Sequence, residues 1–109
     1  MTDVANIDDT RKSEEPKFEL GQIVATPGFL EKALEATESG ESNVVSGILG
    51  RHAIGDWGEC CEEDWASNED ALESEHRLMS VYKFSDGTKF WVITEWDRSV
   101  TTLLLPEEY

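Results

Sequence analysis

The spacing of apolar residues changes at Arg77, and this change limits the folds open to the chain more than any other feature of the sequence. Before Arg77, apolar residues recur every three or four positions, which is typical of amphipathic helices. After it, apolar and polar residues alternate in RLMSVYKF and again in TKFWVITEW, which is typical of β-strands. The pattern therefore predicts helices in the first part of the chain and a sheet in the second.

The dipeptide Asp86-Gly87 lies between the two alternating segments and predicts a two-residue hairpin turn. A loop of that length places Val81 opposite Val92 and Tyr82 opposite Trp91. A second turn leads to the segment VTTLLLP, which predicts a third strand. We expect these three strands to form an antiparallel meander.

Three helices are predicted ahead of the meander. Thr26-Pro27 is typical of a helix start, with threonine as the N-cap and proline in the first turn, and Gly40 is typical of a helix end. A second helix is expected between Asn43 and Gly55, and a third over about residues 60–72. The segment FELGQIVA before them predicts a short strand, which we place at an edge of the sheet.

These elements predict the α+β class, with about three helices followed by a three-stranded antiparallel meander. We expect the helices to pack on one face of the sheet. Residues 18–109 are expected to form a single domain, because a chain of 109 residues suits one hydrophobic core. Residues 1–17 are polar and charged, and they predict a disordered N-terminal lead.

The chain carries 24 acidic and 9 basic residues, which gives a formal net charge of −15. A charge of this sign repels phosphates, so direct binding of DNA or RNA is not expected, whereas a basic protein partner is favoured. No apolar run approaches the roughly 20 residues of a membrane span, and the first residues lack the apolar core of a secretory signal. We therefore expect a cytoplasmic protein without membrane association, in which thiols stay reduced.

Residues 51–72, RHAIGDWGECCEEDWASNEDAL, contain one of the two histidines and both cysteines, which raises the question of metal or thiol chemistry. Structural zinc sites use cysteine pairs separated by two residues, whereas Cys60 and Cys61 are adjacent and would point about 100° apart on a helix. Neighbouring carboxylates also raise the pKa of a thiol. We expect no metal, no cofactor and no disulfide here.

His52 and Asp56 are four residues apart near the expected end of the second helix, and two roles fit them. In the preferred one they form a structural corner with Trp57, because a histidine interacts favourably with a helix C-terminus and Asp56 can cap the next helix. In the other, imidazole and carboxylate act together in a small enzyme. No hydrolase, zinc-protease or phosphate-loop motif accompanies them.

Nine acidic residues and no Lys or Arg occur between Asp56 and Glu75. Beyond the first helical turn such crowding destabilises a helix, because like charges repel. One interpretation is a solvated helix face, and another is a polyanionic surface that meets a basic cleft built for phosphates. Trp96 is the candidate for an exposed aromatic anchor. The residues predicted to contact a basic partner are Glu59, Glu62, Glu63, Glu69, Asp70 and Glu73.

The segments RHAIGDWGE, EEDW, N-x-x-AL, RLMSVYKF and DGTKFWVITEWDRSVTTLLLPEEY resemble a family of small bacterial proteins carried by plasmids, phages and integrated elements. The resemblance covers roughly residues 18–109. Some members bear names taken from restriction systems, and the family has no established activity or catalytic residues. Cys60 and Cys61 are not among its marks. The resemblance implies a setting in mobile DNA.

Small size, strong acidity and this implied setting together predict a non-enzymatic binding protein. The sharpest hypothesis is an anti-defence inhibitor, whose acidic helix face occupies the nucleic-acid channel of a restriction or CRISPR nuclease. The alternative is an accessory module of a plasmid or phage that binds another protein through the hairpin and Trp96, without mimicry.

Overall fold

The computed structural model describes residues 15–38 and 44–109. The order of elements is that of an α+β chain, as predicted, with three helices of the described part ahead of the meander. The predicted helix end at Gly40 and residues 1–14 of the predicted lead lie outside the described residues. The elements are β1 (Gln22–Ala25), α2 (Pro27–Glu38), α3 (Val44–Ala53), α4 (Glu62–Ser74), β2 (Leu78–Lys83), β3 (Lys89–Thr94), β4 (Val100–Leu104) and the short helix η1 (Pro106–Glu108).

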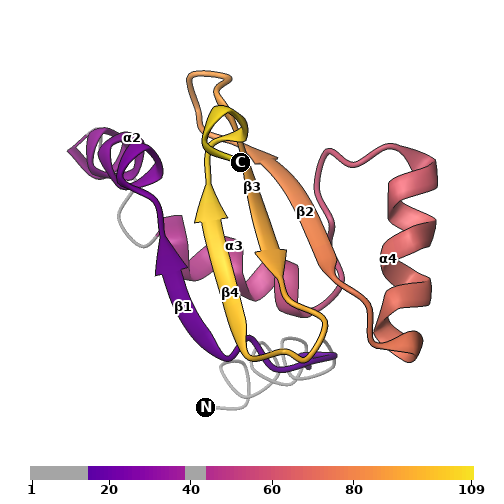
Figure 1. The fold of residues 1–109 in the computed structure, drawn as a ribbon. Coiled ribbons are helices and arrows are strands. Elements are labelled where there is room, and N and C mark those ends of the chain that lie inside the picture. Colours follow the sequence, from indigo (N-terminus) through magenta and orange to yellow (C-terminus); the bar gives the residue numbers. More distant parts are fainter. Residues whose placement is uncertain (1–14, 39–43) are drawn as a thin grey trace, which may run out of the picture.

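The sheet has four strands in the order β1-β4-β3-β2 (Figure 1). Strands β2, β3 and β4 form the predicted antiparallel meander, and β1 is the predicted edge strand. Because β1 runs parallel to β4, the sheet is mixed, which the sequence analysis did not foresee.

The predicted register of the β2–β3 hairpin is wrong by one residue. The backbone N–H of Phe84 donates to the carbonyl of Thr88 at 2.8 Å, so the loop has three residues and not two. Gly87 ends the turn in the left-handed region at φ 90°. This is the turn with a glycine bulge that Asp-Gly also suits. Val81 therefore lies opposite Trp91, and Tyr82 lies opposite Phe90.

The main core lies between α3 and one face of the sheet. Tyr82 and Phe90 pack there with the helix residues Phe29 and Ile48. Val81, which the two-residue loop would place opposite Val92, is instead opposite Trp91 and lies on the other face of the sheet. The buried members of this core are Phe29, Ala33, Ile48, Tyr82, Phe84, Phe90, Val92, Leu103 and Leu105.

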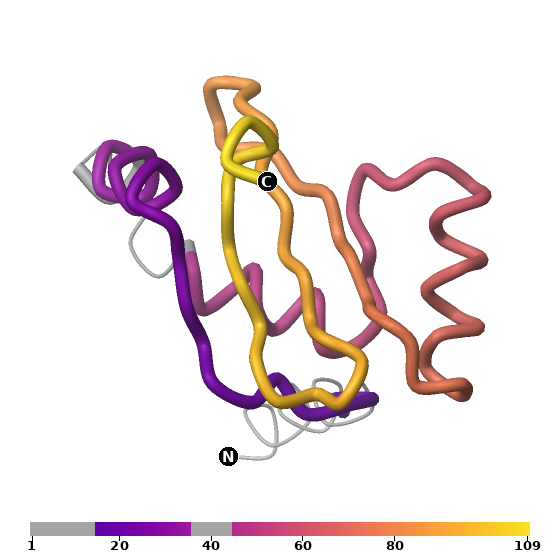
Figure 2. Tube along the Cα trace, viewed as in Figure 1, coloured from indigo at the N-terminus to yellow at the C-terminus, as the bar shows by residue number. Residues whose placement is uncertain are grey.

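The prediction that all helices pack on one sheet face is wrong for α4, whereas α2 and α3 both contribute residues to the main core on that face. Helix α3 lies behind the sheet, whereas α4 stands beside β2 and α2 extends beyond the end of β1 (Figures 1 and 2). Helix α4 packs through a second, smaller core, in which Trp57, Ala71 and Leu78 are buried. Two of its residues, Asn68 and Ala71, are buried in a helix that is otherwise mostly exposed.

The outer edge of β2 is closed by groups that are not a strand. The side-chain amide of Asn68 donates to the carbonyl of Met79 at 2.7 Å and accepts from its N–H at 3.1 Å. Two residues further on, the N–H of Val81 donates to the Trp57 carbonyl at 3.1 Å, and the Val81 carbonyl accepts from the N–H of Glu59. Helix α4 and the turn before it thus take the place of a fifth strand.

Candidate protein-binding surface

His52 is fully buried at the end of α3 and belongs to a chain of hydrogen bonds beneath the sheet. Its Nδ1 lies 2.6 Å from Ser80 Oγ, and its Nε2 lies 2.9 Å from Thr94 Oγ1. Thr94 Oγ1 is 2.7 Å from Thr101 Oγ1, which donates to the Leu20 carbonyl at 2.7 Å. Since Thr101 uses its proton on Leu20, Thr94 must donate to Thr101, and His52 Nε2 must donate to Thr94. This leaves Nδ1 as the acceptor of the Ser80 hydroxyl proton.

The bonding pattern holds the imidazole of His52 in its neutral form. Burial lowers the pKa of His52 from 6.5 to about 3, and the positive charge of Arg98 adds to the effect. All the direct side-chain partners are hydroxyl groups, and the ring has no exposed surface. The geometry therefore favours a structural role for His52.

Asp56 does not pair with His52. Its carboxylate accepts from Arg51 Nε at 2.8 Å and from the backbone N–H of Gly58 at 3.2 Å. The Arg51 bond is the main reason why the pKa of Asp56 is lowered. Because imidazole and carboxylate have different partners, the geometry gives no support to an enzyme built on these two residues.

Trp57 is fully buried between the corner and α4. Its indole Nε1 donates to Glu69 Oε2 at 2.8 Å. Glu69 therefore anchors α4 to the corner, in addition to any contact that it makes with a partner. No local pattern predicts this role, because the two residues are twelve positions apart and belong to different elements.

The two cysteines have different surroundings. Cys60 is partly buried, and its Sγ donates to the Met79 carbonyl at 3.4 Å. Burial is the largest cause that raises the pKa of the Cys60 thiol. Cys61 is exposed at the N-cap of α4, and both thiols are free. Within residues 15–38 and 44–109, no group of three His, Cys, Asp or Glu side chains is placed to hold a metal ion.

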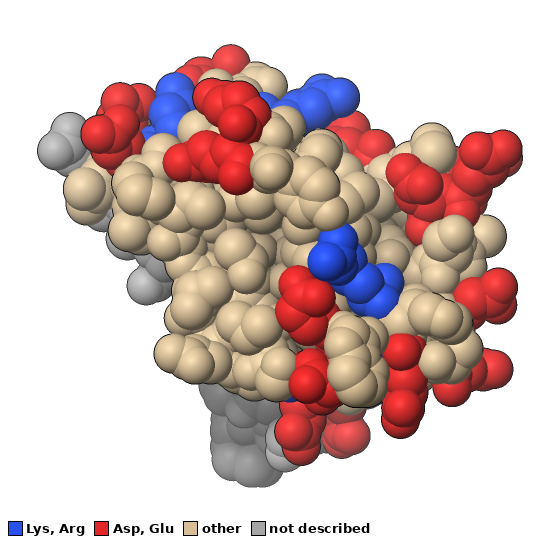
Figure 3. All heavy atoms as spheres, viewed as in Figure 1, with Lys and Arg blue, Asp and Glu red and all other residues tan. Residues whose placement is uncertain are grey.

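The predicted acidic contact residues gather on and just before α4, where Figure 3 shows acidic atoms over the outer side of the helix. Glu62, Glu63, Asp70 and Glu73 are exposed, and helical spacing turns them away from the buried pair Asn68 and Ala71. Glu59 precedes the helix and lies 4.0 Å from Lys83 Nζ. Among the described residues, none of the four exposed carboxylates forms an ion pair within 4 Å, since the pairs present lie elsewhere.

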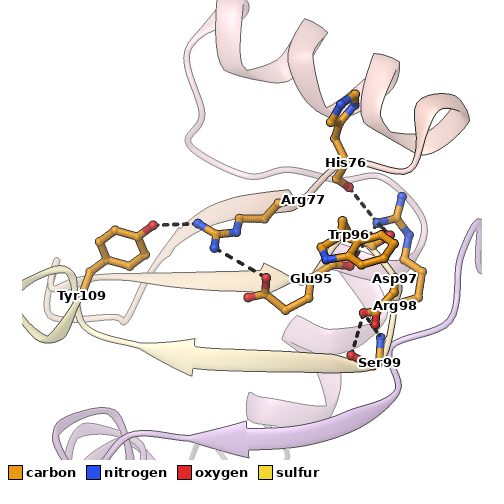
Figure 4. Close-up of polar contacts among 8 residues, drawn as sticks. All are labelled: His76, Arg77, Glu95, Trp96, Asp97, Arg98, Ser99 and Tyr109. Carbon is orange, nitrogen blue, oxygen red and sulfur yellow. Dashed lines mark hydrogen bonds and ion pairs between the residues drawn. The ribbon is translucent and has the colours of Figure 1, made fainter.

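Arg98 joins the end of α4 to the β3–β4 turn, a structural role that was not predicted from the sequence. It adopts φ 60° in that turn, and its guanidinium donates to the Ala71 carbonyl at 2.9 Å. The guanidinium also donates to the His76 carbonyl at 2.7 Å (Figure 4). A cation at a helix C-terminus is favourable. Here the cation, Arg98, belongs to a turn that is distant in the sequence, so no pattern within α4 predicts the interaction.

Trp96 lies in the same turn and is 60% exposed. Nearby, Arg77 donates to the Tyr109 hydroxyl at 2.6 Å and lies 3.5 Å from a carboxylate oxygen of Glu95 (Figure 4). Tyr109 is itself 70% exposed. Trp96 thus lies on the surface next to the end of α4, and Arg77 extends from there toward Tyr109 (Figure 4). Trp, Arg and Tyr side chains are enriched at the centres of protein interfaces.

A surface depression lies at the C-terminal end of the acidic helix. Asp70 and Glu73 of α4 line it, together with His76 and Arg77, which follow the helix. The acidic residues and Trp96 thus belong to neighbouring parts of one surface, because Arg98 holds the Trp96 turn against α4.

No family model, curated protein or solved structure matches the chain. In the described residues, no helix is both long enough and apolar enough to cross a membrane.

Proposed function

We propose that the chain is a non-enzymatic binding protein, whose acidic α4 surface occupies the phosphate-binding cleft of a basic, nucleic-acid-binding protein. A restriction or CRISPR nuclease is the proposed partner, and the cytoplasm of a cell that carries the mobile element is the proposed setting. The observation that carries the proposal is the exposed run of carboxylates on α4, which no Lys or Arg of that helix balances.

The charge density of α4 supports mimicry of a nucleic acid strand. The helix has 13 residues, six of them acidic, and is about 20 Å long at about 1.5 Å per residue. It therefore carries about one negative charge per 3.3 Å, compared with about one per 3.4 Å along a single DNA strand. A cleft that binds phosphates would gain similar attraction from this helix.

The same surface also favours a second candidate function, which is protein binding without mimicry. Trp96 is exposed, and burial of such a side chain in a partner pocket contributes affinity that depends little on salt. In this case α4 would only border the contact.

The test compares two charge-matched triple variants in binding kinetics with a candidate nuclease at low and physiological salt. Glu62→Gln, Asp70→Asn and Glu73→Gln neutralise the helix, and Glu69 is left unchanged because it bonds to Trp57. Glu19→Gln, Glu31→Gln and Glu107→Gln remove the same charge from exposed positions elsewhere. We expect the helix variant to associate about tenfold more slowly at low salt, and the control to associate at nearly the wild-type rate.

Equal rates for the two triple variants would contradict mimicry. The second candidate would be supported if Trp96→Ala weakens binding equally at both salt concentrations. The helix variant should then have little effect on binding.

A further inference from the structure

The two edges of the sheet differ in a way that the proposed function does not explain. At the β2 edge, the outward backbone groups of Met79 are bonded to the side chain of Asn68. Those of Val81 are bonded to the backbone of Trp57 and Glu59. At the other edge, across residues 15–38 and 44–109, β1 pairs with β4 alone. One edge is therefore covered, whereas no strand of the described residues pairs with the outer side of β1.

The open groups of β1 can be assigned from its bonds to β4. The N–H of Gln22 donates to the Ser99 carbonyl at 2.9 Å, and that of Thr26 donates to the Leu103 carbonyl at 3.0 Å. Bonding groups alternate in direction along a strand, so those of Ile23 and Ala25 point away from β4. These two residues present the donors and acceptors that a neighbouring strand would use.

Strand β1 is short, with four residues, but it lacks the charged residues, prolines and bulges with which proteins often protect an open edge. Gln22–Ala25 contains no charged residue and no proline, and pairs with β4 in continuous register. Ile23 and Val24 are 41% and 37% exposed. The strand also lies within Leu20–Leu30, the longest stretch of the sequence without a charged residue. Figure 3 shows few charged atoms over this side of the molecule.

We infer that β1 is the contact surface for a second copy of the chain, which pairs with it in antiparallel orientation. Two chains of net charge −15 repel each other, so stable self-association requires a contact free of acidic residues, and this uncharged strand provides one. A basic partner would gain no electrostatic attraction there, whereas it would at α4. The two surfaces lie at opposite edges of the sheet, so the dimer does not depend on the proposed function (Figure 1).

The direction of the open groups fixes the register of the pair. Ile23 of each copy exchanges two backbone hydrogen bonds with Ala25 of the other, and Val24 faces its own counterpart across the two-fold axis. This gives four hydrogen bonds and one continuous sheet of eight strands. Val24 packs on the face opposite α3, because its neighbour Ala25 contacts the core on the α3 side.

The first test is sedimentation velocity of the full chain from micromolar to submillimolar concentration. We expect the wild type to be a dimer at the upper end. Val24→Lys places two like charges directly opposite each other and should raise the dimer dissociation constant about tenfold or more. Trp65→Lys is the matched control, since Trp65 is 36% exposed and lies on α4 at the other edge. It should leave the dimer intact.

The second test determines the register in a Cys60→Ser, Cys61→Ser background. Val24→Cys should form a disulfide-linked dimer under mild oxidation, because facing residues of this kind have Cα atoms about 4.5 Å apart. Ile23→Cys should not, because its counterpart is a diagonal neighbour about 7–8 Å away. The inference would be overturned if the wild type stays monomeric or if the dimer survives Val24→Lys. It would also be overturned if a disulfide forms through Ile23→Cys and not through Val24→Cys.

Discussion

His52 shows how one buried side chain can couple folding to pH. Its hydrogen bonds to Ser80 and Thr94 require a neutral ring, and its folded pKa of about 3 lies well below the ordinary 6.5. The unfolded chain therefore binds a proton at this residue between these two pH values, and the folded chain does not. Unfolding becomes easier as the pH falls through this window, and the contribution of His52 is fully present only above it.

We expect the free energy of unfolding to fall by up to about 1.4 kcal/mol per pH unit through His52 as the pH drops below 6.5. Urea unfolding of the wild type and of His52→Gln at several pH values measures this. The difference between the two proteins should shrink as the pH falls, because glutamine does not titrate. His76→Gln, at an exposed position, serves as the control. A difference that stays constant from pH 7 to pH 4 would contradict the assignment.

At the scale of elements, the outer edge of β2 depends on one side chain. Asn68 is 5% exposed and supplies both hydrogen bonds that a neighbouring strand would give to Met79. An asparagine amide can do this because it carries a donor and an acceptor in one plane, as a peptide group does. The attachment of α4 to the sheet is thus polar as well as apolar.

Replacing Asn68 by Ala should lower the free energy of unfolding by about 2 kcal/mol, because two hydrogen bonds are lost at a largely buried position. Asn68→Asp should cost at least as much, since a carboxylate cannot donate to the Met79 carbonyl. Chemical denaturation measures both changes, with exposed Ser67→Ala as the control expected within about 0.5 kcal/mol of the wild type. A neutral Asn68→Ala would show that α4 is held by its apolar contacts alone.

The elements that the sequence predicted well are those with local signals. Thr26-Pro27 marks the start of α2, and the Thr26 hydroxyl accepts from the Phe29 N–H as an N-cap does. The hairpin register was missed because Asp86-Gly87 fits loops of two and of three residues. The bonds of Asn68, Glu69 and Arg98 could not be predicted, because each joins segments that only the tertiary fold brings together. The acidic cluster and its exposure were both predictable from the sequence, because acidic residues beyond the first turn of a helix favour solvent.

At the scale of the whole molecule, charge is distributed unevenly along the sheet. Acidic residues crowd α4 beside β2, and the β1 edge carries none. A net charge of −15 on 109 residues also opposes compaction, because like charges come closer together in the folded chain than in the unfolded one.

Screening should therefore stabilise the fold. We expect the Tm to rise by a few degrees when sodium chloride increases from about 10 mM to about 150 mM, which shortens the Debye length from about 30 Å to about 8 Å. The variant with Glu62→Gln, Asp70→Asn and Glu73→Gln should start from an equal or higher Tm and gain less from salt. Scanning calorimetry measures both shifts. A Tm that falls with salt would indicate that attractive ion pairs outweigh repulsion.

The covered β2 edge sets how far self-association can proceed. A subunit with two open edges can add copies without end and grow into a fibril, whereas pairing through β1 alone stops at a closed, two-fold assembly. In that assembly the two α4 helices lie beyond opposite ends of a sheet about 34 Å wide, since eight strands are spaced about 4.8 Å apart. The particle would then be bivalent: two acidic surfaces at a fixed separation could engage two basic clefts of one oligomeric partner, with an avidity that neither contact has alone.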